Sequence, residues 1–258
     1  MKITCLLENT STRENLIPEH GLSLLIQTES HRILFDMGQT SRFAENAKLL
    51  GEDLSTVDLA ILSHGHYDHG GGLPTFLTLN SNAPIYINRH AFGDYYNGDG
   101  KYIGLDHSLK NHARVILTDD LLQIDDTLTL RSCNSLPRPN FPGCFGLTQK
   151  IADEFIDDAF LHEQYLLIEE KGKRVLISGC SHKGILDITQ WFAPDVLIGG
   201  FHFSKMPTDH KLTEIAKKLG KEKTTYYTCH CTGTAQYDFM KADLRNLHYL
   251  SCGDSINI

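Results

Sequence analysis

Residues 59–72 read LAILSHGHYDHGGG, and the rest of the sequence is interpreted outward from this stretch. It opens with a short apolar run of the kind that forms a buried strand. Four side chains that bind metal ions follow within six residues, and three glycines come directly after them. These four side chains are His64, His66, Asp68 and His69. A strand leading in and glycines leading out favour a ligand site at a strand end over a solvated histidine-rich loop.

The spacing of the four side chains indicates which of them act together. His64 and His66 point the same way while the chain is extended, because side chains alternate along a strand. If the backbone turns at Gly70–Gly72, we expect Asp68 and His69 to face a second ion. Imidazole and carboxylate ligands suit Zn²⁺, Fe or Mn²⁺, and paired ions are a familiar hydrolytic arrangement. The stretch predicts two divalent metal ions, with Zn²⁺ favoured over Fe and Mn²⁺.

The first half of the chain reads as a mixed sheet with two helices. Glu29–His31 reads as a hairpin turn between its second and third strands. The strands are expected at Ile3–Leu7, Leu22–Thr28, Arg32–Phe35, Leu59–Leu62, Ile85–Asn88, Val115–Thr118 and Thr127–Ser132, and the helices at Phe43–Leu50 and Leu73–Leu79.

The second half repeats this plan after an irregular segment rich in Pro and Gly, Arg138–Gly146. Strands are expected at Tyr165–Glu169, Arg174–Ser178, Val196–Ile198, Thr225–Thr228 and His248–Leu250, and helices at Ile185–Phe192, Leu212–Leu219 and Ala235–Asp243. Two sheets with helices on their outer faces predict a four-layer αββα sandwich of the α/β class. We interpret residues 1–258 as one domain with halves of about 1–140 and 141–258.

Composition limits the classes of partner and the cellular compartment that we expect for this protein. The 258 residues carry a formal net charge of -8, which disfavours nucleic acid as the main partner. No export signal and no membrane span are visible. Seven cysteines, an odd number, are typical of reduced thiols, so we expect a cytoplasmic protein. The expected partner is a small-molecule substrate, and the sequence leaves open whether copies of the chain form a homo-oligomer.

Residues 64–71, HGHYDHGG, resemble the HxHxDH signature of the metallo-β-lactamase fold superfamily. The resemblance extends over nearly the whole chain, to a subgroup described as dihydropteroate-synthase-like or as similar to 7,8-dihydropterin-6-yl-methyl-4-(β-D-ribofuranosyl)aminobenzene 5'-phosphate synthase. It rests on Glu8–Thr10, His20–Ser23, Phe35–Gly38, Ser178–Ile185, Gly199–His202 and His230–Gly233. The resemblance implies a metallo-β-lactamase-like αββα fold and a metal-dependent hydrolase.

The resemblance also implies ligands from later segments. His230, after a late strand, matches the last ligand of the family, and His162, just before a strand, matches a third-segment ligand. An intermediate Asp of the family is replaced by Cys180, with His182 two residues later. We favour His182 over Cys180, because the two occur together in this subgroup and an imidazole needs no deprotonation near neutral pH.

Several residues are expected near the metal ions without binding them. Asp36 is expected to orient the metal-binding loop, and His202 to contact substrate or donate a proton. Cys229 and Cys231 read as buried thiols. The backbone N–H groups of Gly70–Gly72 and of Thr232–Gly233 precede helices and could hold a substrate anion.

Three functions follow from these residues. The leading hypothesis is a hydrolase in which Asp68 is catalytic and a metal-activated water attacks a small ester or phosphate-containing substrate. The first alternative is a transferase that joins a dihydropterin to a ribofuranosylaminobenzene phosphate, as the subgroup implies. The second is a metal-stabilised ligand-binding protein without turnover, which the replacement of the family's Asp by Cys180 would suit.

Overall fold

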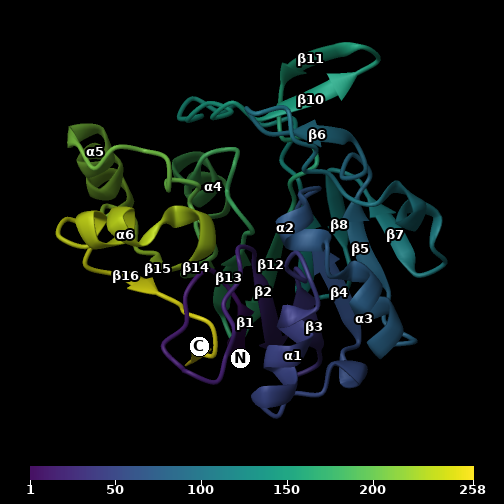
Figure 1. Cartoon of the computed structure of the whole chain (residues 1–258). Coiled ribbons are helices and arrows are strands. Elements are labelled where there is room, and N and C mark those ends of the chain that lie inside the picture. The colour runs from purple at the N-terminus through teal and green to yellow at the C-terminus, as the bar shows by residue number, and fades with distance from the viewer. The chain divides into compact units, whose positions relative to one another are not determined.

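The computed structural model describes all 258 residues, and its chain divides into two compact units that interleave in sequence (Figure 1). Unit 1 comprises Met1–Asp119, Gly146–Glu163 and Ser251–Ile258. Unit 2 comprises Asp120–Phe145 and Gln164–Leu250. Each unit has its own seven-stranded sheet, its own helices and its own apolar core.

The main sheet of unit 1 is mixed, with the strand order β17-β1-β2-β3-β4-β5-β7. Its strands are β1 (Lys2–Leu7), β2 (Ser23–Gln27), β3 (Arg32–Phe35), β4 (Leu59–Leu62), β5 (Ile85–Asn88), β7 (Val115–Thr118) and β17 (Ser255–Asn257). The strands from β17 to β3 pair antiparallel, and those from β3 to β7 pair parallel. The fully buried run of β4 is typical of a central parallel strand. Parallel pairing brings the carboxyl ends of β3 and β4 to the same edge.

Helices of unit 1 cover this sheet with apolar faces. They are α1 (Arg42–Leu49), η1 (Leu54–Thr56), α2 (Tyr67–Gly70), α3 (Leu73–Leu79) and η2 (His107–Asn111). Phe43 of α1 and Phe76 of α3 are fully buried and share one core with Leu34, Ala60 and Ile85 of the sheet. This packing fixes the chain on both sides of the segment that follows β4.

Unit 1 also has a three-stranded sheet in the order β11-β10-β6. Its strands are β6 (Asp94–Tyr96), β10 (Thr148–Ile151) and β11 (Glu154–Asp157). None of the three was predicted from the sequence, because β10 and β11 are exposed or half-buried throughout and carry no apolar alternation. Two other short strands, β8 and β17, were missed for the same reason.

Unit 2 has a mixed sheet in the order β16-β15-β14-β13-β12-β9-β8. Its strands are β8 (Leu121–Gln123), β9 (Leu128–Arg131), β12 (Tyr165–Glu170), β13 (Lys173–Ile177), β14 (Val196–Ile198), β15 (Thr225–Thr228) and β16 (Leu247–Tyr249). Its helices are α4 (Ile185–Phe192), α5 (His210–Leu219), η3 (His230–Thr232) and α6 (Thr234–Met240). The strands from β13 to β16 pair parallel, so their carboxyl ends share one edge.

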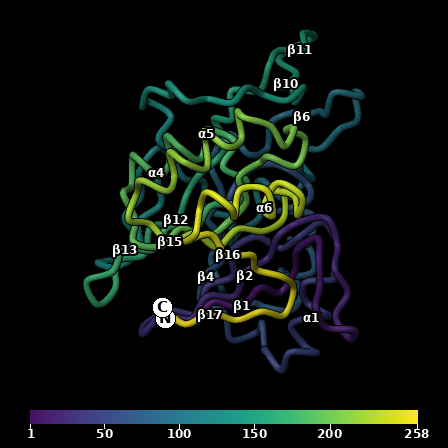
Figure 2. The backbone as a smooth tube through the Cα atoms, turned by 90° about the vertical axis from the view of Figure 1, so that its left-hand side faces the viewer, coloured from purple at the N-terminus to yellow at the C-terminus, as the bar shows by residue number.

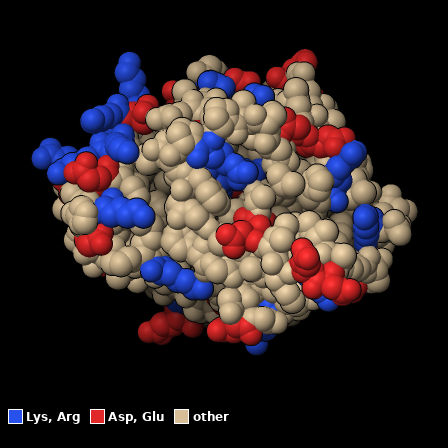
Figure 3. All heavy atoms as spheres, turned by 90° about the horizontal axis from the view of Figure 1, so that it is seen from above, with Lys and Arg blue, Asp and Glu red and all other residues tan.

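The predicted α/β class with two mixed sheets is confirmed. The ends of the chain meet in unit 1, where the Met1 amino group donates to the Ile258 carbonyl at 3.0 Å beside the β1–β17 pair (Figure 2). Acidic and basic side chains are interspersed on the face seen in Figure 3. None of the helices is long and apolar enough to span a bilayer.

Candidate metal centre

The donor side chains after β4 lie on backbone of two conformations, extended at His66 and helical from Tyr67 onward. His66 is extended, with φ −98° and ψ 145°, and caps α2, which starts at Tyr67. Asp68 and His69 lie within α2, and the turn at Gly71–Gly72 joins α2 to α3. The chain thus turns at two of the three glycines, and a short helix that starts at Tyr67 precedes the turn.

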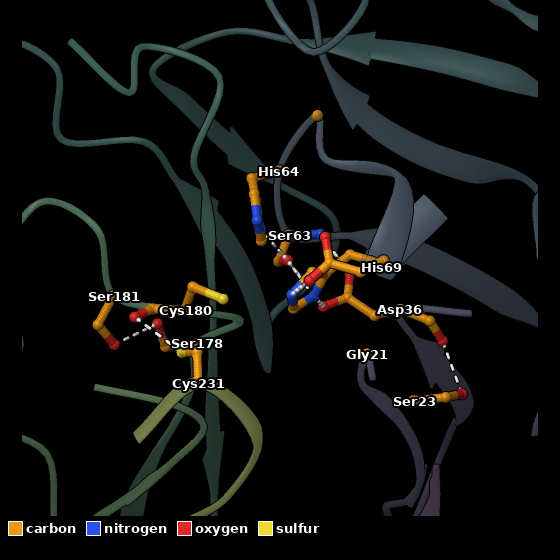
Figure 4. Close-up of polar contacts among 12 residues, drawn as sticks. Gly21, Ser23, Asp36, Ser63, His64, His69, Ser178, Cys180, Ser181 and Cys231 are labelled. Atoms are coloured by element: carbon orange, nitrogen blue, oxygen red, sulfur yellow. Dashed lines mark hydrogen bonds and ion pairs between the residues drawn. The ribbon is translucent and has the colours of Figure 1, made fainter. Parts of the chain in front are cut away.

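A buried carboxylate orients two of the histidines (Figure 4). Asp36 follows β3 and accepts hydrogen bonds from the Ser63 N–H, the Ser63 hydroxyl and His69 Nδ1, at 2.7, 2.7 and 2.6 Å. The Ser63 hydroxyl also lies 2.8 Å from His64 Nδ1. With the hydroxyl donating to Asp36, both rings carry their proton on Nδ1. Nε2 is then the nitrogen of each ring that offers a lone pair to a cation.

His66 meets a second buried carboxylate. Its Nε2 lies 3.8 Å from Asp158 Oδ2, and both side chains are buried. Burial lowers the pKa of His66 to about 4, so this imidazole is neutral near pH 7. Burial alone would raise the pKa of Asp158, but His162 and His66 hold it well below its usual value. A neutral imidazole next to a carboxylate is the state in which histidine binds metal ions.

His162 is engaged through both ring nitrogens. Nδ1 accepts the Gly65 N–H at 2.9 Å, and Nε2 donates to Asp158 at 3.0 Å. The ring also lies 4.1 Å from that of Tyr95, centroid to centroid. His66, Asp158 and His162 offer ligand atoms within 4.8 Å of one another. As placed, His162 holds the backbone between His64 and His66, so its role as a ligand stays a prediction.

Asp68 is the least buried of the four donors. Its carboxylate lies 3.2 Å from His20 Nε2 and 3.8 Å from His69 Nε2. The Asn9 amide lies 3.3 Å from His20 Nδ1 and steadies that ring. Asp68 thus has two imidazoles of unit 1 beside it, that of His20 from the loop before β2 and that of His69 from α2.

The glycines do not present N–H groups for an anion. Gly70, Gly71 and Gly72 donate to backbone carbonyls of His66, Tyr67 and Gly38. Thr232 and Gly233 donate to those of Cys229 and His230. The predicted anion site is therefore wrong at both places. At Gly72, a Cβ would lie 2.1 Å from the Met37 carbonyl oxygen. The close approach of two backbone segments explains this glycine.

The donors of unit 1 fit a divalent cation in their chemistry. Three imidazoles and one carboxylate are gathered on one segment. The centroid of the His64 ring lies 4.6 Å from that of His66 and 4.1 Å from that of His69. All three rings are buried. Mixed nitrogen and oxygen ligation suits Zn²⁺, Mn²⁺ or Fe.

The remaining predicted residues lie in unit 2, in loops that follow parallel strands. Cys180 and His182 follow β13, His202 follows β14, and His230 starts η3 after β15. The rings of His182 and His202 lie 4.2 Å apart, centroid to centroid. The structure thus brings Cys180, His182 and His202 to one sheet edge, and their functional roles stay predictions.

Cys231 is the residue of unit 2 that the sequence did not single out as a donor. It is buried, as expected, but its thiol accepts the His202 N–H at 3.3 Å and lies 3.6 Å from the Cys180 carbonyl oxygen. Burial would raise the pKa of this thiol. Hydrogen bonds with Cys180 and His202, and the charges of His230 and His202, instead hold the pKa of Cys231 well below its usual value.

Two residues of unit 1 were missed as well. Asp158 precedes His162 by four residues, a spacing that could have been noticed, and Ser63 stands directly before the first histidine. Neither residue type signals metal chemistry by itself, because Ser and Asp are common in loops.

Comparisons with known proteins identify the family of this chain. The family model of the metallo-β-lactamase superfamily matches residues 16–135. A protein of Methanocaldococcus jannaschii described as uncharacterized, MJ0448, is 30% identical over 272 residues, which cover 99% of this chain and 100% of that protein. The chain belongs to the metallo-β-lactamase superfamily. Members of this superfamily are mostly metal-dependent hydrolases.

A second relative has a named activity. The 7,8-dihydropterin-6-methyl-4-(beta-D-ribofuranosyl)-aminobenzene-5'-phosphate synthase of the same organism is 31% identical over 271 residues, which cover 89% of this chain and 88% of the synthase. This match confirms the resemblance to the synthase-like subgroup.

Solved structures extend the comparison. Tm1679, described as a metal-dependent hydrolase of the β-lactamase superfamily, matches this chain with a TM-score of 0.85 and 28% identity. The match covers 100% of this chain and 99% of the Tm1679 chain. The metallo-β-lactamase fold protein YhfI of Bacillus subtilis has a TM-score of 0.61 and 15% identity over 99% of both chains, which shows a shared fold alone.

Proposed function

We propose that this protein is a metal-dependent hydrolase that acts on a small, anionic ester or phosphate-containing substrate. The proposal rests on one observation above all, the buried donor set after β4, in which Asp36 and Ser63 orient the rings of His64 and His69. Outside a metal site, three buried imidazoles and a carboxylate are costly to gather. Similarity to Tm1679, described as a metal-dependent hydrolase, adds support.

His64, His66, Asp68 and His69 are the proposed ligands in unit 1, and Zn²⁺ is the proposed metal. A divalent cation held there would lower the pKa of water toward neutrality and would supply positive charge for a hydrolysis. Asp36 and Ser63 hold His64 and His69 in one tautomer, so these rings need no reorientation during turnover. The ligand roles of His162, Cys180, His182 and His230, the proton-donor role of His202 and the presence of two ions are part of the same proposal.

Replacing Asp68 tests the hydrolase directly. With metal-replete protein, we expect Asp68→Ala to lower turnover of bis(p-nitrophenyl) phosphate or p-nitrophenyl acetate by about 100-fold or more, because even partners of metal ligands contribute about 10- to 100-fold. The matched control is Asp153→Ala, since Asp153 is fully exposed in the β10–β11 turn. Elemental analysis of each variant gives the metal content. Unchanged turnover in Asp68→Ala would overturn the assignment.

The second candidate is a transferase, which the similarity to the named synthase favours. In that reaction, a dihydropterin would be joined to a ribofuranosylaminobenzene phosphate. Mass spectrometry of a reaction that contains both substrates separates the two candidates, because hydrolysis alone releases no coupled product. Metal-replete protein that turns over neither substrate class and retains a small ligand would instead indicate a binding protein.

A further inference from the structure

Three neighbouring parallel strands of unit 2 each deliver one soft or borderline metal donor to the same edge. Cys180 lies in the loop after β13, His202 in the loop after β14 and Cys231 in η3 after β15. The carboxyl ends of parallel strands are where open α/β sheets bind ligands. One ligand atom from each residue lies within 4.8 Å of the other two.

Contacts within this group hold the Cys231 sulfur in place. The His202 N–H donates to Cys231 Sγ at 3.3 Å, and Cys231 Sγ lies 3.6 Å from the Cys180 carbonyl oxygen. Cys180 and Cys231 are 3% and 6% exposed, so neither is a surface thiol. Nδ1 of His202 is buried and has no hydrogen-bond partner. A buried nitrogen without a partner is costly unless something binds it.

The backbone around the group is shaped to leave room for these side chains. A Cβ at Gly200 would lie 2.3 Å from Cys231 Sγ, so only glycine leaves space for the sulfur. Ser181, His202 and His230 have positive φ values of 57°, 56° and 48°. Each of them is one of the three donors or its direct neighbour in sequence. Left-handed residues other than glycine are uncommon and gather at functional sites.

We propose that Cys180, His202 and Cys231 form a binding site for a thiophilic cation such as Zn²⁺, Cd²⁺ or Cu⁺, a donor set made only of residues of unit 2. Two cysteine sulfurs and one imidazole are the ligands that such ions prefer over harder cations. With three protein donors, a zinc ion keeps one coordination position for an external ligand. Each thiol releases its proton to solvent as it binds the cation.

Cobalt substitution tests this site apart from the hydrolase proposal. Metal-free, reduced protein is titrated with Co²⁺ under anaerobic conditions. Cysteine sulfur bound to Co²⁺ gives charge-transfer bands in the near ultraviolet, whereas a site of histidine and aspartate gives only weaker visible bands. We expect near-ultraviolet bands in the unmodified protein, and loss of half or more of their intensity in both Cys180→Ser and Cys231→Ser. In a chelator competition, each variant should bind this Co²⁺ more than about 100-fold more weakly.

Cys229→Ser is the matched control, because Cys229 is fully buried in the same segment but lies outside the group. This variant should keep the bands, and circular dichroism shows that each variant is folded. His202→Ala should weaken Co²⁺ binding while it keeps the sulfur bands at high Co²⁺. If Cys180→Ser removes the bands and Cys231→Ser leaves them unchanged, Cys180 binds metal without Cys231 and the proposal fails. Visible bands without any sulfur bands would also overturn it, together with the ligand role of Cys180 in the hydrolase proposal, and would leave the histidine and aspartate ligands of unit 1 standing.

Discussion

The donor residues of the two units are held in place by different means. In unit 1, Asp36 and Asp158 are buried carboxylates that receive hydrogen bonds from histidine rings and from the backbone beside them. In unit 2, the loops are held by the main chain and by hydroxyl groups. The Ser178 and Ser181 hydroxyls pair at 2.8 Å (Figure 4). The Thr232 hydroxyl accepts the Phe201 N–H at 2.8 Å.

This difference shows which contacts fix the position of the donor side chains in each unit. A charged hydrogen bond is roughly twice as strong as a neutral one, so the rings of unit 1 are fixed by a few strong contacts. The donors of unit 2 depend on many weaker contacts and on the exact backbone path of three loops. Replacing a single carboxylate should therefore disturb the donors of unit 1. The donors of unit 2 should be disturbed by substitutions at positions where two of the loops are in contact.

The largest effect is expected at Asp36. Asp36→Ala leaves three buried donors without their acceptor, and it places Ala at a φ of 59°. Loss of one partner from a buried charged network costs about 3–5 kcal/mol. We expect urea unfolding to show a loss of this size, and metal affinity to fall by about 10- to 100-fold. Asp36→Asn keeps an acceptor and should lose less; equal losses in both variants would argue against an orienting role.

Gly65 tests whether the backbone between two histidines can move. A Cβ at this position would lie 2.2 Å from the Ala91 carbonyl oxygen, and the Gly65 N–H also donates to His162. Gly65→Ala should cost about 1–3 kcal/mol through overpacking and should weaken metal binding. Gly98→Ala is the control, because its nearest neighbour would lie at 3.5 Å. Equal thermal midpoints for the two variants would contradict the close approach.

Gly200 is the corresponding position in unit 2. Gly200→Ala should cost about 1–3 kcal/mol, because the added methyl group overlaps Cys231 Sγ. Cys231→Ala in the same chain removes the overlap, so the double variant should recover part of the loss in a double-mutant cycle. Gly98→Ala, whose nearest contact would be 3.5 Å, again serves as control. Simple additivity of the two substitutions would show that the sulfur does not lie where the structure places it.

The smallest effect is expected at Asp120, a half-exposed carboxylate of unit 2. Hydrogen bonds from Ser132, followed by the Asn134 N–H, lower the pKa of Asp120 below its ordinary value of 3.8. A lowered pKa stabilises the fold above pH 3.8, and this contribution is lost as the pH falls through the folded-state value. Asp120→Asn should therefore flatten the decline of unfolding free energy below about pH 4. A decline identical to that of the unmodified protein would contradict the assignment.

Much of the fold could be predicted from the sequence where apolar patterns are strong. The bounds of β3, β4, β5, α3, α4 and β14 match the prediction to the residue. β10 and β11 could not be predicted, because their side chains are exposed and their pairing with β6 joins segments far apart in the sequence. For the same reason, nothing local indicated that residues 146–163 belong to unit 1.

The residues of the candidate site also differ in whether a local pattern or a contact between distant segments reveals them. His64, His66, Asp68 and His69 lie within six residues, so their spacing alone predicted a common site. Asp158 was missed because its contact with His66 depends on how unit 1 folds. Cys231 was interpreted as an ordinary buried thiol, since its relation to Cys180 and His202 exists only once three strands are aligned.

The place of β17 bears on how the protein is made. β17 completes the sheet of unit 1, yet it follows every residue of unit 2 in the chain. A ribosome must therefore synthesise the whole of unit 2 before β1 receives its outer neighbour. Until then, the nascent sheet has an open edge, which can pair with another chain. Protection of that edge by a chaperone during translation would matter more for this protein than for one whose sheets are completed in order.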